Sequence, residues 1–176
     1  ALGSGPDKEI IDVAAAPDDK LVVIGDFTSW NGTSVPKIVR LNADGTRDTG
    51  FDAGTGPASG YLRSVAVQPS GKIIVTGSFL AWNGTTGLGG IVRLNTDGSV
   101  DTAFATTTGT GFTYSPSGLP VAASIVTQSD GKIVAVGQFD GFNGAFTLSI
   151  LRLTVDGATD ATFNLDSDDP GGFYAP

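Results

Sequence analysis

Apolar residues occur in short runs along this chain, and glycine, aspartate, asparagine or proline bounds each run. The clearest run is rich in valine and isoleucine and occurs three times, at residues 20–25, 72–77 and 132–137. Runs of this length and composition between turn residues are typical of β-strands. Because consecutive positions are apolar, we expect both faces of these strands to be buried between neighbouring sheets.

These runs belong to a longer unit that the chain contains three times. In each unit a first apolar strand precedes the buried strand, and an aromatic-Asn-Gly triplet, an Ile-x-Arg-Leu strand and an Asp-Gly turn follow it. An aspartate and a phenylalanine close the unit, and the closing phenylalanines Phe51, Phe104 and Phe163 lie roughly 50 to 60 residues apart. Such a period indicates one supersecondary unit stacked on copies of itself.

We therefore predict an all-β fold of three tandem four-stranded repeats that form β-propeller-like blades, within a single repeat domain over residues 1–176. Repeat one is assigned to residues 8–60, repeat two to 61–119 and repeat three to 120–170. First strands are expected at 11–15, 64–68 and 124–128, and third strands at 37–42, 90–95 and 149–154. A short fourth strand should end at each closing phenylalanine, and no segment has the periodicity of a helix.

Three blades are fewer than the roughly four to eight of a closed propeller. The sequence leaves three solutions open. Chains could associate to complete a ring, for example two chains that supply six blades together. The chain could instead be a piece of a longer array, or its repeats could close as a β-trefoil.

The composition restricts the possible functions of the chain more than it restricts the fold. The net charge is −8, so nucleic acid is not an expected partner, because phosphate binding needs a basic surface. No apolar stretch is long enough for membrane insertion. The chain has no Cys, His or Met, which excludes thiol chemistry and removes the commonest general base and metal ligand.

The acidic residues offer little sign of catalysis. A catalytic carboxylate pair should occur once, whereas most aspartates recur in turns shared by the repeats. Asp166, Asp168 and Asp169 form the clearest cluster that is not repeated, and a solvated acidic tail explains it. The Asp-Gly turns lack the terminal glutamate of a calcium loop. We therefore predict no enzyme, no catalytic residue, no metal and no cofactor.

The arginines of the third strands stand inside apolar runs and need partners. Arg40, Arg93 and Arg152 each precede a recurrent aspartate, and we expect ion pairs with Asp48, Asp101 and Asp160 in the same or the next blade.

The aromatic-Asn-Gly triplet is the best candidate for ligand binding. An aromatic ring beside an amide suits a sugar, and repetition would supply multivalency. The alternative is structural, because the ring could fill space between blades and Asn-Gly is ordinary turn chemistry. A long connection from Thr106 to Pro120 adds Phe112 and Tyr114, and long loops on rigid scaffolds often determine specificity. The candidate ligand-binding residues are Trp30, Asn31, Trp82, Asn83, Phe142, Asn143, Phe112 and Tyr114.

These motifs resemble the delta-sixty repeat of bacterial surface proteins and phage tail proteins over residues 10–163. The resemblance implies propeller-like blades and an extracellular, cell-surface or virion location. It suggests a non-enzymatic structural and binding module of an appendage, such as a tail fibre or an adhesin, that presents loops on a rigid scaffold. Expected partners are copies of the chain, neighbouring appendage subunits or a cell-surface glycan. Two alternatives remain, a multivalent lectin and a carbohydrate-active enzyme.

Overall fold

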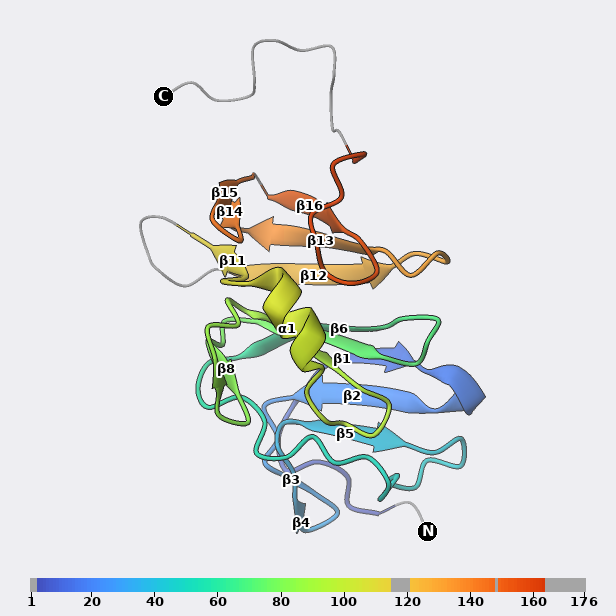
Figure 1. The fold of residues 1–176 in the computed structure, drawn as a ribbon. Helices are drawn as coiled ribbons and strands as arrows, with labels where there is room; N and C mark the ends of the chain where they lie inside the picture. The colour runs from blue at the N-terminus through green and yellow to red at the C-terminus, as the bar shows by residue number, and fades with distance from the viewer. Residues whose placement is uncertain (1–2, 115–120, 148, 164–176) are drawn as a thin grey trace.

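The computed structural model describes residues 3–114, 121–147 and 149–163, and Figure 1 shows their strands in successive sheets from the N-terminal to the C-terminal repeat. Each repeat forms one antiparallel sheet in which the second strand lies between the first and the third. The sheets comprise β1 (Ile10–Ala15), β2 (Leu21–Gly25) and β5 (Ile38–Leu41); β6 (Leu62–Val67), β7 (Ile73–Gly77) and β10 (Ile91–Leu94); and β12 (Val121–Thr127), β13 (Ile133–Gln138) and β16 (Ile150–Leu153).

A short hairpin leaves each sheet between the second and third strands. The aromatic-Asn-Gly triplet forms its turn in every repeat. The hairpins are β3 (Ser29–Trp30) with β4 (Thr33–Ser34), β8 (Ala81–Trp82) with β9 (Thr85–Thr86), and β14 (Gly141–Phe142) with β15 (Ala145–Phe146). In repeat three a further strand, β11 (Phe112–Thr113), joins the hairpin.

The prediction of an all-β fold with three tandem propeller-like repeats is confirmed, and the observed strands lie within a few residues of the predicted ones. The predicted fourth strand is only a single bridge in each repeat, such as Leu94 with Val100. After that bridge in repeat two, the chain forms α1 (Thr102–Thr108), a helix that we did not predict. Its N-cap is Asp101, whose carboxylate accepts a hydrogen bond from the Phe104 amide. A 3₁₀ turn, η1 (Pro17–Asp19), connects β1 to β2.

The hydrophobic core lies mainly between successive blades. One buried cluster joins repeats one and two, for example through Ile24, Val65 and Trp82, and a second cluster joins repeats two and three. The first strands β1, β6 and β12 lie beside one another. The prediction that both faces of the second strands are buried holds for β7, whose five residues are all buried. Leu21 of β2 and Val136 of β13 are exposed, because among the described residues these strands have a neighbouring repeat on one side only.

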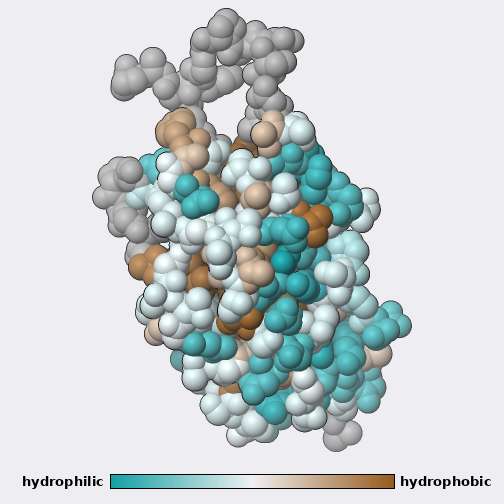
Figure 2. All heavy atoms as spheres, viewed as in Figure 1, coloured by the Kyte–Doolittle hydropathy of each residue, from teal (hydrophilic) through white to brown (hydrophobic). Residues whose placement is uncertain are grey.

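The outer surface carries no large apolar area in the view of Figure 2, where hydrophobic side chains form small separate patches among hydrophilic ones. Within the described residues, no helix is both long and apolar enough to cross a membrane.

Candidate functional site

The aromatic-Asn-Gly triplets make the tight turns of the short hairpins. Asn31, Asn83 and Asn143 have φ angles of 50°, 48° and 48°, and the glycines that follow have φ angles of 77°, 78° and 76°. Positive φ at both central residues defines the type I′ turn, which matches the twist of a two-stranded ribbon. Asparagine and glycine are the residues that tolerate these angles best. The backbone alone therefore accounts for the triplet's last two residues.

The asparagine side chains hold the segment that leads into each blade. Asn83 Oδ1 accepts hydrogen bonds from the amides of Thr55 at 2.6 Å and Gly56 at 2.9 Å, while its Nδ2 donates to the Ala53 carbonyl at 2.9 Å. Asn31 Oδ1 accepts from the Gly5 amide at 2.7 Å. The whole amide group of Asn83 and the amide oxygen of Asn31 are thus engaged within the protein.

The rings of the triplets are buried. Trp82 is fully covered, lies edge-on to Phe79 with ring centroids 5.6 Å apart, and donates from Nε1 to the Ala53 carbonyl at 3.3 Å. Trp30 packs in the same way on Phe27, and Phe142 packs on Phe112. A sugar cannot stack on a covered ring unless the hairpin moves. This arrangement favours the structural interpretation that the sequence left open.

A cluster of two cations, one carboxylate and one aromatic ring recurs in every repeat, as the sequence predicted for its arginine and aspartate. In repeat two, Asp101 Oδ2 accepts from Lys72 Nζ at 2.7 Å and from Arg93 Nε at 2.9 Å. The Arg93 guanidinium also lies over the Phe104 ring, 4.4 Å from its centroid. The equivalent groups are Lys20, Asp48, Arg40 and Phe51 in repeat one, and Lys132, Asp160, Arg152 and Phe163 in repeat three.

These clusters keep their carboxylates charged. The hydrogen bond from Lys20 makes the largest contribution to a lowered pKa of Asp48; burial opposes it, and with the Gly50 amide and Arg40 included this pKa is about 2. Burial raises the pKa of Asp101, but the bonds from Lys72, the Phe104 amide and Arg93 outweigh burial and leave this pKa below its ordinary value. Groups that stay ionised in this way act as structural anchors and are poorly suited to exchange protons.

The clusters also join consecutive repeats. Arg40 Nη1 donates to the Thr96 carbonyl in the Asp-Gly turn of repeat two, and Arg93 Nη1 donates to the Val155 carbonyl in the equivalent turn of repeat three at 2.5 Å. Gln68 strengthens the second junction, where its amide donates to the Gly131 carbonyl at 2.7 Å and to the Val155 carbonyl at 3.1 Å.

The first junction differs because Ala16 occupies the position of Gln68. A hollow of about 450 Å³ is present there, lined among others by Ala16, Lys20, Arg40, Ser70 and Asp97. Its lining offers cationic donors, a hydroxyl group and a carboxylate to a small polar molecule. In the sequence this hollow is indicated by Ala16, because the equivalent position holds a glutamine, Gln68 or Gln128, in the other two repeats.

Repeat three carries the most distinctive surface. Pro6 and Pro57 each form a single bridge to the tryptophan of their hairpin, whereas Phe112 and Thr113 pair with β14 as a strand. Phe112 is buried against Phe139 and Phe142, and Tyr114 accepts a hydrogen bond at its hydroxyl from Gln138 Nε2 at 2.9 Å. The described part of the long connection thus contributes structure to the hairpin, and residues 115–120 lie outside the described residues.

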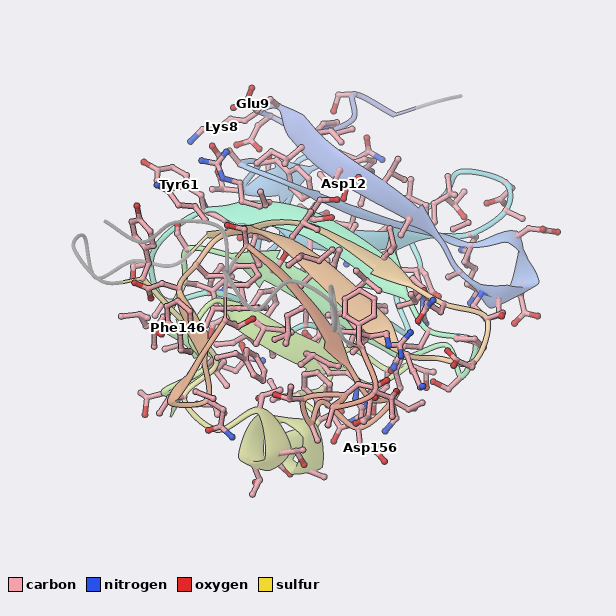
Figure 3. The ribbon with its side chains drawn as sticks, turned by 90° about the horizontal axis from the view of Figure 1, so that it is seen from above. Lys8, Glu9, Asp12, Tyr61, Phe146 and Asp156 are labelled. Carbon is pink, nitrogen blue, oxygen red and sulfur yellow. The ribbon has the colours of Figure 1, made fainter. Side chains whose placement is uncertain are left out.

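Phe146 stands at the outer strand of this sheet and is 78% exposed. It lines a hollow of about 280 Å³ together with Phe142, Leu151 and Phe163, and a second one of about 410 Å³ with Thr113 and Asp140. Figure 3 places Phe146 on the same side of the molecule as Tyr61 and well apart from Asp156. Phe146 was not among the predicted binding residues, although the other repeats have Ser34 and Thr86 at this position.

Carboxylates do not gather elsewhere in the part of the chain that the structure describes. No group of three or more His, Cys, Asp or Glu side chains in these residues is arranged to hold a metal ion. Asp166, Asp168 and Asp169 lie outside the described residues.

Comparisons with known proteins identify the repeat. The chain matches a beta-propeller family, described as a domain of unknown function (DUF5122), at residues 16–51, 68–104 and 128–163. A comparison with curated proteins finds no match. This family match favours propeller blades over the β-trefoil alternative.

Several solved structures are similar to this chain. A gluconolactonase from Xanthomonas campestris is 17% identical with a TM-score of 0.49, and the match covers 90% of this chain and 47% of that one. A structural-genomics target with a proposed gluconolactonase assignment is 23% identical with a TM-score of 0.47, and the match covers 89% of this chain and 49% of that one. PorZ, a surface component of the type-IX secretion system of Porphyromonas gingivalis, is 12% identical with a TM-score of 0.41. That match covers 86% of this chain and 20% of PorZ.

These neighbours correct one prediction. The chain was expected not to be an enzyme, but two similar structures carry the gluconolactonase description, so the exclusion of enzymes is withdrawn. The chain spans about half the length of those two proteins, and no activity of this chain follows from them. What the matched repeats establish is the family: the chain belongs to the DUF5122 beta-propeller family.

Proposed function

We propose that this chain is a structural and binding module of an extracellular or virion appendage, built from repeats of the delta-sixty type. The module holds a binding surface in a fixed position on a rigid stack of blades. The resemblance of the repeat motifs supports the appendage and its location. Junction bonds such as those of Arg40 and Arg93 support rigidity, because partly buried charge-assisted bonds have one favourable geometry.

The observation that carries the binding role is Phe146. A large aromatic side chain that is mostly exposed, at a position where the other repeats have Ser34 and Thr86, has no role in the packing of the repeat. Exposed aromatic residues beside a hollow are common centres of binding surfaces. Phe146 lines two hollows, which give a partner room beside the ring.

Binding of the fluorescently labelled protein to bacterial cells and to a glycan array tests this proposal. The variant Phe146→Ser restores the residue that repeat one has, so the fold should be retained. We expect it to lose at least roughly tenfold in affinity for whichever surface the native protein binds, as hot-spot residues do. The matched control Val155→Ser removes an exposed apolar side chain from a distant turn and should bind normally. Equal binding by Phe146→Ser, or no binding of the native protein to any probe, contradicts the proposal.

The lectin alternative has no specific support from the triplets, since their rings are buried and the amide group of Asn83 and the amide oxygen of Asn31 are engaged. A glycan that bound at Phe146 would appear in the same array experiment.

A further inference from the structure

The outer face of repeat one exposes residues that are buried at equivalent positions of the other repeats. Val13 of β1 is 53% exposed, whereas its equivalents Val65 and Ile125 are 5% and 4% exposed. Leu21 of β2 is 39% exposed, whereas Ile73 and Ile133 are fully buried. In repeats two and three the preceding blade covers these positions. Repeat one thus exposes an apolar surface equivalent to the one that repeats two and three bury against the preceding blade.

The outer face of repeat three presents the opposite half of such a junction. Val126 is 56% exposed, whereas its equivalent Ala66 is 7% exposed. Val136 is 39% exposed, whereas Ile24 and Thr76 are fully buried at the same place in the other repeats. Figure 1 shows repeats one and three at opposite ends of the stack.

The Asp-Gly turns show where a preceding repeat would lie. A Cβ atom at Gly98 would be 2.5 Å from the Asp52 carbonyl oxygen, and one at Gly157 would be 2.7 Å from the Phe104 ring, so the preceding repeat packs tightly on both glycines. At Gly45, the equivalent glycine of repeat one, a Cβ atom would meet no atom of the described residues within 4 Å. The turn of repeat one therefore has the space that a preceding repeat fills elsewhere.

The guanidinium groups show where a following repeat would lie. Arg40 and Arg93 each donate to a carbonyl in the next repeat's turn, at Thr96 and Val155. Arg152 instead donates from Nη2 to Thr162 of its own repeat at 3.2 Å. The residue of repeat one equivalent to Thr96 and Val155 is Ala43, which lies in the exposed turn beside Gly45.

We propose that the outer face of repeat three binds the outer face of repeat one of a second copy of this chain. Val126 and Val136 would cover Val13 and Leu21 of that copy, and Arg152 would donate to its Ala43 carbonyl. A second copy is the occupant that these observations favour, because each half of the interface is built like the two junctions inside the chain. The contact is heterologous, since different surfaces meet, so it leaves one free half at each end of the assembly until a ring closes. The inference does not depend on the partner bound at Phe146.

Light scattering of paired variants tests the proposal. The native protein should have a mass of at least two chains. Val13→Glu damages the repeat-one face and Val136→Glu damages the repeat-three face, and both replace exposed side chains, so each variant should fold and be monomeric. A mixture should form a pair of one copy of each, because the intact repeat-three face of the first variant fits the intact repeat-one face of the second. The control Leu80→Glu alters an exposed leucine of repeat two, whose faces are both covered, and should assemble as the native protein does.

Three outcomes overturn the inference. A native protein that is monomeric at all concentrations has no such interface. A mixture of the two variants that stays monomeric, although urea unfolding shows each to be as stable as the native chain, excludes a head-to-tail contact. Loss of assembly in Leu80→Glu equal to that in Val13→Glu places the contact elsewhere.

Discussion

The guanidinium of Arg93 donates a hydrogen bond from Nη1 to the main-chain oxygen of Val155, 2.5 Å away in the next repeat. The same guanidinium binds Asp101 through Nε and covers the Phe104 ring. One side chain thus joins the third strand of its own repeat, the closing residues of that repeat and the turn of the following one. This arrangement explains why an arginine stands in the middle of an apolar strand.

Alanine substitutions at two equivalent glycines test how tightly one repeat packs on the Asp-Gly turn of the next. Gly98 and Gly45 both have positive φ, 97° and 82°, so alanine brings backbone strain at either position. Only at Gly98 does the new Cβ also meet the Asp52 carbonyl oxygen. We expect Gly98→Ala to cost about 1 to 3 kcal/mol more in the free energy of unfolding than Gly45→Ala. Urea unfolding at a protein concentration where both are monomeric gives the difference, and equal losses would refute the packing.

Two substitutions test the difference between the junctions: each gives one junction the residue that the other junction has at the equivalent position. Gln68→Ala removes the bonds to the Gly131 and Val155 carbonyls and the acceptor of Arg93 Nη1, and we expect a loss of about 1 to 3 kcal/mol. Ala16→Gln should fill the hollow beside Arg40 and leave stability unchanged or raise it. Thermal unfolding compares the two. A loss in Ala16→Gln as large as that in Gln68→Ala would show that the junctions are not equivalent.

Thr76 carries a buried polar atom that can be removed. Among the described residues, its hydroxyl oxygen is buried without a hydrogen-bond partner, and the equivalent residues Ile24 and Val136 are apolar. Burial of an unpaired hydroxyl costs about 1 to 3 kcal/mol, so Thr76→Val should be neutral or raise the free energy of unfolding by about 1 kcal/mol. The control Thr106→Val alters an exposed helical residue and should change little. Clear destabilisation by Thr76→Val would mean that the hydroxyl has a partner.

The pH dependence of stability should reflect the cluster carboxylates. The pKa of Asp48 is about 2 in the folded protein, below the ordinary value of 3.8 that applies to the unfolded chain. A lowered pKa stabilises the fold above the ordinary value, and this contribution is lost as the pH falls from about 4 to about 2. Urea midpoints should therefore fall across that window. In Asp48→Asn the fall should be smaller, and an unchanged slope would show that Asp48 does not contribute to it.

The repeat pattern was sufficient to predict the first three strands of each repeat and the arginine–aspartate pairs, because apolar runs and isolated charges recur at fixed places. The short hairpin strands were not predicted, and the predicted fourth strand is only a single bridge. The acceptors of the junction bonds were not predictable, since Thr96 and Val155 accept through main-chain oxygens that any residue supplies. Helix α1 was missed because a seven-residue segment of alanines, threonines and one phenylalanine shows no helical period, and its N-cap Asp101 already had an expected role as an ion-pair partner.

The candidate ligand-binding residues were also predicted only in part from the sequence. The asparagines were proposed as ligand contacts because an amide beside an aromatic ring suits a sugar, and the sequence alone cannot tell an exposed ring from a buried one. Alignment of the repeats would have identified Phe146, whose equivalents are Ser34 and Thr86, as the aromatic residue without a structural reason.

Urea unfolding of Arg40→Ala, Arg93→Ala and Arg152→Ala under one condition, at a concentration where all are monomeric, tests the central claim that the clusters of repeats one and two join these repeats to the next. The side chain of Arg93 is 5% exposed and joins two repeats, and that of Arg40 is 13% exposed and also does so. The side chain of Arg152 is 18% exposed, and among the described residues its bonds stay within its own repeat. The account predicts a loss of about 3 kcal/mol for Arg93, a smaller one for Arg40 and about 1 kcal/mol for Arg152. Equal losses at the three positions would contradict it.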